Sequence, residues 1–287
     1  MQNLTLIIEP WPDYELLDSG DNRKLERFGK FIIVRPETQA IWKVLKPDLW
    51  KQVAGEFAWQ DGKGAWRKKK ELPESWQMAW EDIRFSVRLT SFKHTGIFPE
   101  QEENWKWIGR AARDRGLHVL NLFGYTGIAG IAAAKKGARV THVDASKQSN
   151  EWAKENAKLS GVPDGAIKFL LDDALKFAER EARRGAEYGG IILDPPAFGR
   201  GPKGEVWRIE EHLPRLLDAL AKLLSRKPGS FFLLNGYAAG YSPTSFLQAV
   251  ESSFDLKNAR GEFGELMLRG ARGGPVIPQG IYIRFVR

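Results

Sequence analysis

The chain has 287 residues, enough for one large core or for a core with a second, smaller domain. Apolar residues make up 43% of it, and no apolar run approaches the roughly twenty residues of a membrane span, so no membrane protein is expected. The absence of cysteine excludes disulfides, thiolate metal sites and cysteine catalysis, while a net charge of +8 favours an anionic partner. With no export signal near the start, we expect a cytoplasmic protein.

Residues 1–92 are expected to form a small β-rich domain. Short runs of β-branched and aromatic residues, such as Phe31–Val34 and Ile83–Val87, are separated by turns rich in Pro, Gly and Asp. Most of the eleven tryptophans fall in this part, and most of these are expected in its core.

The densest cationic cluster of this domain runs from Trp66 through Arg67 to Lys70. Four cations beside an aromatic residue can contact phosphates and stack a base, which would make this a possible RNA-binding domain. Lysines that protect an exposed hairpin edge explain the cluster equally well.

Residues 93–287 are expected to form an α/β domain, because helical patterns alternate with apolar strands after Thr95. This alternation is typical of a doubly wound, Rossmann-like sheet. Helices are expected over residues 128–136, 147–159 and 206–225, another helix begins at Ser242 and Pro243, and residues 280–286 alternate like a closing strand.

A glycine-rich turn follows the apolar strand that ends at Leu122. Its glycines, Gly124, Gly127 and Gly130, depart from the Gly-x-Gly-x-x-Gly spacing of dinucleotide loops, and no Walker Gly-Lys-Ser/Thr is present. The turn therefore indicates a cofactor loop that holds no bulky phosphate group. Glycines that only shape a tight turn are the alternative.

Acidic residues end the next two apolar runs. Asp144 lies before Ser146, a candidate helix N-cap, and a carboxylate at a strand end can accept two hydrogen bonds from a ribose diol. Asp172 and Asp173 end the following run and suit an adenine amino group. Helix capping is the alternative for Asp144, and it would explain one of the other two aspartates equally well.

The fourth strand end carries the segment Asp-Pro-Pro-Ala-Phe, from Asp194 to Phe198, after the apolar run Ile191–Leu193. The two prolines fix their backbone angles and remove two N–H donors, which leaves carbonyl acceptors beside a carboxylate. Such a loop can hold an amino group or a base edge, with Phe198 as a stacking face. A strand terminator with a buried Phe is the alternative.

Other catalytic chemistries find little support in the sequence. The four histidines are dispersed without metal-binding spacing, so no metal site is expected, and no Gly-x-Ser-x-Gly elbow anchors a hydrolase triad. No pattern indicates an oligomeric state.

Taken together, the chain resembles the class I S-adenosylmethionine (SAM) dependent methyltransferases, and more narrowly the branch with bacterial large-subunit (23S) ribosomal RNA methyltransferases. The resemblance rests on segments in a fixed order: Tyr14–Gly20, Leu25–Gly29, Lys93–Gln101, Asn121–Gly127, Asp144, Asp172–Ala174 and Asp194–Phe198. It implies the family's seven-stranded Rossmann-like sheet with an antiparallel last strand.

The resemblance also implies a SAM site and an RNA partner, which is expected to be ribosomal RNA. Asp144, with Ala145 next to it, would bind the ribose, Asp173 and Ala174 would meet the adenine, and Asp194 would lie beside the methyl group. The methionine part would be lined by Asn121, Phe123, Gly124, Tyr125, Thr126 and Gly127. The catalytic loop would consist of Asp194, Pro195, Pro196 and Phe198.

The absence of cysteine, in which this chain departs from part of the family, restricts the choice of the acceptor atom. Relatives that make 5-methylcytosine use a cysteine nucleophile, and this chain has none, so a base nitrogen is expected. In amino-group methyltransferases an aromatic residue often follows the two prolines directly, whereas here Ala197 intervenes. Methylation of a protein or small molecule, or an RNA-binding assembly factor that transfers nothing, are the alternatives.

Overall fold

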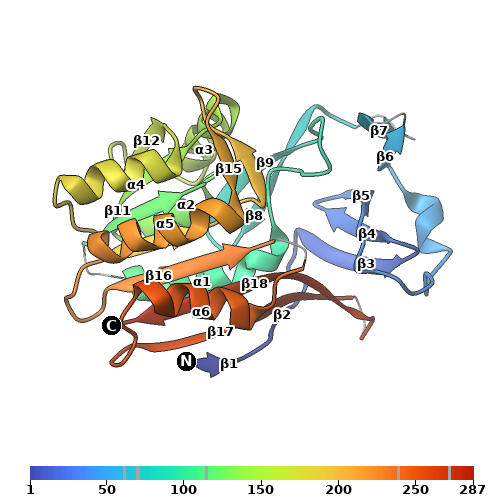
Figure 1. The fold of residues 1–287 in the computed structure, drawn as a ribbon. Coiled ribbons are helices and arrows are strands. Elements are labelled where there is room, and N and C mark those ends of the chain that lie inside the picture. The colour runs from blue at the N-terminus through green and yellow to red at the C-terminus, as the bar shows by residue number, and fades with distance from the viewer. Residues whose placement is uncertain (61–62, 69–71, 114–115, 238–239, 271–272) are drawn as a thin grey trace. The chain divides into compact units, whose positions relative to one another are not determined.

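The computed structural model describes residues 1–60, 63–68, 72–113, 116–237, 240–270 and 273–287 (Figure 1). The chain divides into two compact units. The α/β unit comprises Met1–Leu6, Glu103–Glu265 and Gly280–Arg287, and the β unit comprises Ile7–Glu102 and Leu266–Gln279. The sequence placed a single boundary between residues 92 and 93. In the structure the main boundary falls after Glu102, and the chain also passes between the units near both of its ends.

A nine-stranded sheet organises the α/β unit, and its parallel centre is β12-β11-β10-β13-β16. The antiparallel strand β18 follows β16, which confirms the parallel-dominated sheet with its last strand reversed, whereas the described residues form nine strands in this sheet and not the expected seven. Strands β17, β1 and β2 complete the edge. In spatial order the strands are β12 (Ile167–Leu171), β11 (Arg139–Asp144), β10 (His118–Leu122), β13 (Gly190–Leu193), β16 (Phe231–Gly236), β18 (Val276–Val286), β17 (Arg260–Arg269) and β1 (Gln2–Asn3), with β2 (Leu6–Ile8) also paired to β17.

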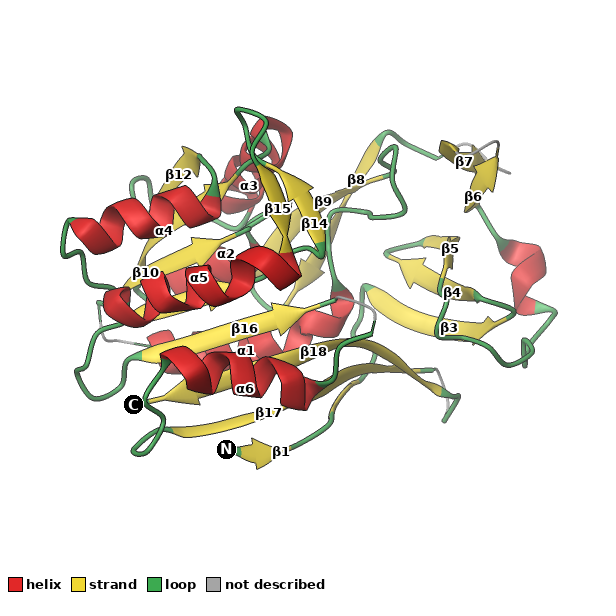
Figure 2. Cartoon of the chain, viewed as in Figure 1, coloured by secondary structure: helices red, strands yellow, loops and turns green. Residues whose placement is uncertain are grey.

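Helices cover both faces of this sheet (Figure 2). On one face lie α1 (Glu102–Ala112), α2 (Ile128–Ala134) and α3 (Lys147–Leu159), and on the other lie α4 (Ala174–Arg183), α5 (Ile209–Leu223) and α6 (Pro243–Ser253). Ser146 and Ser242 cap α3 and α6 with their side chains, as the sequence indicated. Each cap satisfies a backbone N–H that the helix leaves without a partner.

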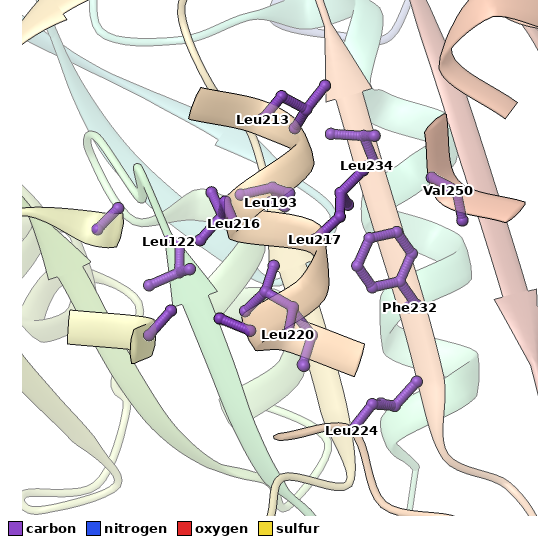
Figure 3. Close-up of a cluster of buried hydrophobic side chains, with 14 of the residues drawn as sticks. Leu122, Leu193, Leu213, Leu216, Leu217, Leu220, Leu224, Phe232, Leu234 and Val250 are labelled. Atoms are coloured by element: carbon purple, nitrogen blue, oxygen red, sulfur yellow. The ribbon is translucent and has the colours of Figure 1, made fainter. Parts of the chain in front are cut away.

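The main core of the α/β unit lies between α5 and the centre of the sheet (Figure 3). Leu213, Leu216, Leu217 and Leu220 recur at helical spacing, so one face of α5 presents all four to the sheet. They pack against Leu122, Leu193, Phe232 and Leu234 from β10, β13 and β16. Full burial of each such side chain stabilises the fold by about 1.5–3 kcal/mol. The core fixes the strand ends that carry the site.

The predicted start of one helix is wrong. The sequence predicted a helix over residues 206–225, but α5 begins at Ile209 and Val206–Arg208 form strand β15. β15 pairs antiparallel with β14 (Phe198–Arg200) to form a short hairpin. The helical pattern continued through these residues because Val206 and Trp207 are apolar, whereas cross-strand pairing with β14, a few residues earlier in the chain, decided their conformation.

The β unit is β-rich, as expected. Its larger sheet has the order β3-β4-β5-β6-β7, and β8 pairs with β9 in a separate hairpin. The strands are β3 (Tyr14–Gly20), β4 (Arg23–Phe28), β5 (Phe31–Pro36), β6 (Gly55–Gln60), β7 (Lys63–Lys68), β8 (Ser75–Trp80) and β9 (Ile83–Arg88), and two short 3-10 helices span Leu49–Gln52 and Pro99–Gln101.

The cationic cluster of the sequence lies partly on β7, the last strand of that sheet. Arg67 and Lys68 are exposed there, while Lys69 and Lys70 fall outside the described residues. The indole N–H of Trp66 donates to the carbonyls of Thr90 and Phe92. Trp66 therefore has a structural role within the β unit. Throughout the described ranges, no helix is long and apolar enough to cross a membrane.

Candidate active site

The three predicted site segments meet at one edge of the central sheet. Strand β10 lies between β11 and β13, and all three are parallel, so their carboxyl ends share an edge. The chain leaves β10 toward β11 on one side and returns to β13 on the other. This change of direction is the topological switch point at which open α/β sheets bind ligands.

The loop after β10 has an unusual backbone. Phe123 and Tyr125 have φ values of 53° and 47°, and Gly127 has 87° at the start of α2. The left-handed region costs about 1 kcal/mol or more for a residue with a side chain, so such angles persist only where neighbours hold them. This concentration of strained residues is typical of a ligand-binding loop.

The side chains of His142 and Asn121 leave no room for a Cβ atom at position 124, which explains the glycine there. A Cβ atom there would lie 2.4 Å from Cε1 of His142 and 2.9 Å from Nδ2 of Asn121. Both of those side chains are buried, and Nδ2 of Asn121 lies 3.5 Å from Nδ1 of His142. Burial lowers the pKa of His142 to about 4, so the ring is neutral at physiological pH. A neutral ring and an amide thus support the loop, and contact of Asn121 with the methionine part stays a prediction.

Asp144 joins the ends of β10 and β11. Its Oδ2 accepts a hydrogen bond from the backbone N–H of Tyr125, and its Oδ1 accepts one from Ser146, both at 2.8 Å. Desolvation raises the pKa of this carboxyl group, whereas the hydrogen bonds from the two backbone N–H groups lower it. Each oxygen retains a second lone pair, which is the arrangement that two ribose hydroxyls require.

The aspartates after β12 have structural partners. Asp173 caps α4 by accepting from the N–H of Lys176 at 2.9 Å, so helix capping does explain one of the two aspartates. Asp172 forms a salt bridge with Arg180 at 2.7 Å. Ala174 is buried in the first turn of α4. A role for Asp173 and Ala174 at the adenine therefore rests on the resemblance and stays a prediction.

The segment after β13 leaves the core abruptly. The backbone N–H of Asp194 donates to the carbonyl of Leu122 at 3.4 Å, which holds the two strand ends together. Pro195 is buried, whereas Pro196, Ala197 and Phe198 are exposed. The side chain of Phe198 is 55% exposed, so the alternative of a strand terminator with a buried Phe is wrong.

Two of the expected carbonyl acceptors in this loop are already used within the chain. The carbonyl of Pro196 accepts from the indole N–H of Trp207 at 2.7 Å, and that of Ala197 accepts from the N–H of Ile209 at 3.0 Å. One lone pair of each of these two carbonyl oxygens is therefore engaged within the chain.

Trp207 is a site residue that sequence reasoning missed. It is buried, and its ring centroid lies 4.9 Å from that of Phe123 in the glycine loop. Through this ring contact and its bond to Pro196, Trp207 connects the cofactor loop to the Asp194 loop. The only signal in the sequence was an aromatic residue at the start of an expected helix, which is a common feature of any core.

The hairpin that follows the Asp194 loop has two different faces. Phe198 lies opposite Arg208, and Arg200 lies opposite Val206, so these four side chains share one face, and all are exposed. Trp207 occupies the other face. Arg208 lies 3.6 Å from Glu211, an exposed pair that contributes little stability. We call these four residues the hairpin face.

Within the ranges that the structure describes, no group of three or more His, Asp or Glu side chains is arranged to hold a metal ion. The residues at the strand ends instead fit SAM, because Asp144 offers two carboxylate oxygens for a ribose and the loop from Phe123 to Gly127 is tightly turned beside it.

Comparison with known proteins agrees with this geometry. Residues 55–257 match the sequence model of a family described as S-adenosylmethionine-dependent methyltransferase. A SAM-dependent methyltransferase from Agrobacterium tumefaciens superposes with a TM-score of 0.92 at 41% sequence identity, covering 99% of this chain and 93% of that one. SMU.776, a protein solved in complex with SAH, superposes with a TM-score of 0.76 at 19% sequence identity, covering 96% of this chain and 76% of that one.

Curated relatives match a shorter stretch. The ribosomal RNA large subunit methyltransferase K/L of Shewanella frigidimarina is 35% identical over 144 residues, and that of Shewanella sp. strain ANA-3 is 35% identical over 145. The match covers 50% of this chain but only 20% of each relative, so the chain spans about a fifth of their length. The family match over most of the chain and the likeness to the Agrobacterium enzyme agree with the site: the chain belongs to the S-adenosylmethionine-dependent methyltransferase family, and its cofactor is SAM.

Proposed function

We propose that this methyltransferase modifies ribosomal RNA at a nitrogen atom of a base. The observation that carries the proposal is the exposed ring of Phe198, which follows Asp194 by four residues and shares the hairpin face with Arg200 and Arg208. An aromatic surface with two cations beside it suits an unstacked base whose neighbouring phosphates contact those cations. The net charge of +8 and the curated relatives that act on large-subunit ribosomal RNA support the same substrate.

The chemistry needs positioning more than acid or base strength. SAM supplies a methyl group already activated on a sulfonium, so the chain has to align the acceptor with it. In this proposal Phe198 stacks on the base, and Asp194 with the Pro195 carbonyl accepts hydrogen bonds from the amine. Bound SAM would supply its methyl group to the nitrogen lone pair and would leave as S-adenosylhomocysteine, with the electron pair of the broken carbon–sulfur bond on sulfur. The methylated nitrogen then releases one proton, for which Asp194 is the base in this loop.

The absence of cysteine supports nitrogen over carbon as the acceptor atom. Methylation at C5 of cytosine requires covalent attack on the ring to make that carbon nucleophilic, commonly by a thiolate, and this chain supplies none. A nitrogen already has a lone pair or gains one by losing a proton.

The identity of the methylated nucleoside tests this proposal. Purified protein is incubated with methyl-labelled SAM and unmodified ribosomal RNA or its precursor particles, and the digested nucleosides are identified by mass spectrometry. We expect label on a base nitrogen of guanine or adenine. Label on C5 of cytosine would exclude nitrogen as the acceptor, and label on a protein component alone would exclude RNA.

The hairpin face provides a second test. Reversing both arginines, Arg200→Glu with Arg208→Glu, is expected to weaken binding of a single-stranded oligoribonucleotide and to lower its salt slope by about 0.7 for each lost phosphate contact. The measurement is fluorescence anisotropy across a salt series, with SAM affinity expected to stay at the wild-type value.

The control for this test is Arg139→Glu with Arg183→Glu. Both of these residues are exposed, and they lie at the start of β11 and the end of α4, away from the carboxyl edge of the sheet. The control changes the net charge by the same amount, so equal effects from the two pairs would contradict a specific role for the hairpin face.

The β unit is proposed as an additional RNA contact through Arg67 and Lys68, which are exposed on the edge strand β7. Ribosomal RNA as the substrate also makes the cytoplasm the expected location.

A further inference from the structure

Three buried polar side chains of the α/β unit, those of Arg284, Asn104 and Asn235, form a chain of hydrogen bonds that we call the relay. Nη1 of Arg284 donates to Oδ1 of Asn104 at 2.8 Å, and Nδ2 of Asn104 donates to Oδ1 of Asn235 at 2.9 Å. Arg284 also pairs with Glu262, with Nε 2.7 Å from Oε1. The side chains of Arg284, Asn104 and Asn235 are all buried. A buried polar group is costly unless it is hydrogen-bonded, so a chain of three such groups needs a reason.

The relay has a fixed direction because arginine has donors and no acceptor. Asn104 must turn its oxygen toward Arg284, which turns its NH₂ group toward Asn235. Asn235 must in turn present its oxygen to Asn104. The positive charge of Arg284 therefore sets the amide orientation of Asn235 through Asn104. The relay uses only the oxygen of the Asn235 amide and leaves its NH₂ group free to donate elsewhere. Nδ2 of Asn235 has no hydrogen-bond partner among the residues that the structure describes.

Asn235 lies next to Asp194 in the sheet. Strands β13 and β16 are parallel neighbours with Leu193 opposite Leu234, so the same register places Asp194 beside Asn235 at the carboxyl edge. Leu193 and Leu234 both face the core under α5. Because successive residues of a strand alternate between faces, Asp194 and Asn235 follow on the other face.

We propose that Asn235 donates a hydrogen bond from Nδ2 to the acceptor base, and that Asn104 and Arg284 are positioning residues that hold it in this orientation. The inference deepens the proposed function and rests on it. A donor beside the acceptors of the Asp194 loop matches a base edge on which the methylated nitrogen adjoins an unprotonated ring nitrogen or a carbonyl oxygen. Such a pair would hold the base in one orientation and expose one nitrogen to the methyl group.

The first test is Asn235→Asp, which keeps an oxygen for Asn104 and replaces the donor by a carboxylate. We expect SAM affinity within about twofold of wild type and a kcat lower by about ten- to a hundredfold, the effect of losing a hydrogen bond and leaving its partner unsatisfied. The rate of this variant should rise as the pH falls, because a protonated Asp can donate again. Asn258→Asp, an exposed position, is the control for the added charge.

The second test leaves position 235 unchanged. In Asn104→Asp the new carboxylate pairs with Arg284 and can only accept from Asn235, so the amide of Asn235 must turn round and present its oxygen to the base. We expect a fall in kcat close to that of Asn235→Asp, again with normal SAM affinity. If Asn104 had only a structural role, Asn104→Asp would not lower kcat by the same factor as Asn235→Asp while SAM affinity stays normal.

The outcomes separate this inference from the proposed function. Wild-type protein that methylates no RNA would overturn both. Wild-type activity on RNA, together with full activity in folded Asn235→Asp or in folded Asn104→Asp, would overturn the relay and leave the proposed function standing. Circular dichroism and SAM titration establish folding of each variant before the rates are compared.

Discussion

Alanine at position 194 is expected to lower the rate of methyl transfer by about a hundredfold or more, the scale of losing a positioned acid or base. SAM binding should stay within about twofold of the wild-type value, because Asp194 is proposed to act on the acceptor and not on the ribose. The measurements are single-turnover transfer of labelled methyl to the identified RNA and calorimetric titration with SAM.

Two variants sharpen that result. Asp194→Asn keeps the shape and one accepting oxygen, so its loss should be smaller than that of Asp194→Ala if the carboxylate orients the amine. Asp164→Ala removes an exposed carboxylate from the loop between α3 and β12 and should change neither quantity. Transfer at the wild-type rate in folded Asp194→Ala would remove Asp194 from the catalytic loop.

Alanine at position 144 is expected to weaken SAM binding by about ten- to a hundredfold, since a hydrogen bond to a charged group contributes about 1.5–3 kcal/mol. The loss has two expected sources, because the carboxylate is proposed to bind the ribose and also accepts hydrogen bonds from the backbone N–H groups of Tyr125 and Ser146. Calorimetric titration measures the affinity, and urea unfolding measures the free energy of unfolding.

The two sources can be separated. Loss of the two backbone hydrogen bonds alone should lower the stability by about 1–3 kcal/mol without SAM, whereas loss of the ribose contact appears only in the affinity. Asp164→Ala is again the matched control. An unchanged affinity in a folded Asp144→Ala protein would place the ribose elsewhere.

The sequence by itself determined the alternation of strands and helices and the residues at the strand ends. Helix α3 spans residues 147–159 as predicted, because its N-cap Ser146 and its apolar spacing are local signals. The strand before Asp194 was found because a central parallel strand reads as an unbroken apolar run, and the strand before Asp144 because its run is rich in apolar residues. Since parallel strands end at a common edge, the same signals brought the three site segments together.

Tertiary structure decided the features whose partners lie far apart in the chain. Asn104 and Asn235 are separated by 131 positions, and Asn104 and Arg284 by 180, so no local pattern could reveal that relay. Trp207 gained its role through Phe123, which is also far from it in the chain. The hairpin of β14 and β15 joins nearby segments, yet its pairing overrode an apparent helical pattern and set the start of α5. Local signals fix which face an element buries, whereas a contact between two elements depends on how the whole sheet assembles. For this chain, the sequence alone placed the site at the strand ends, and the assembled sheet decided which side chains support and orient it.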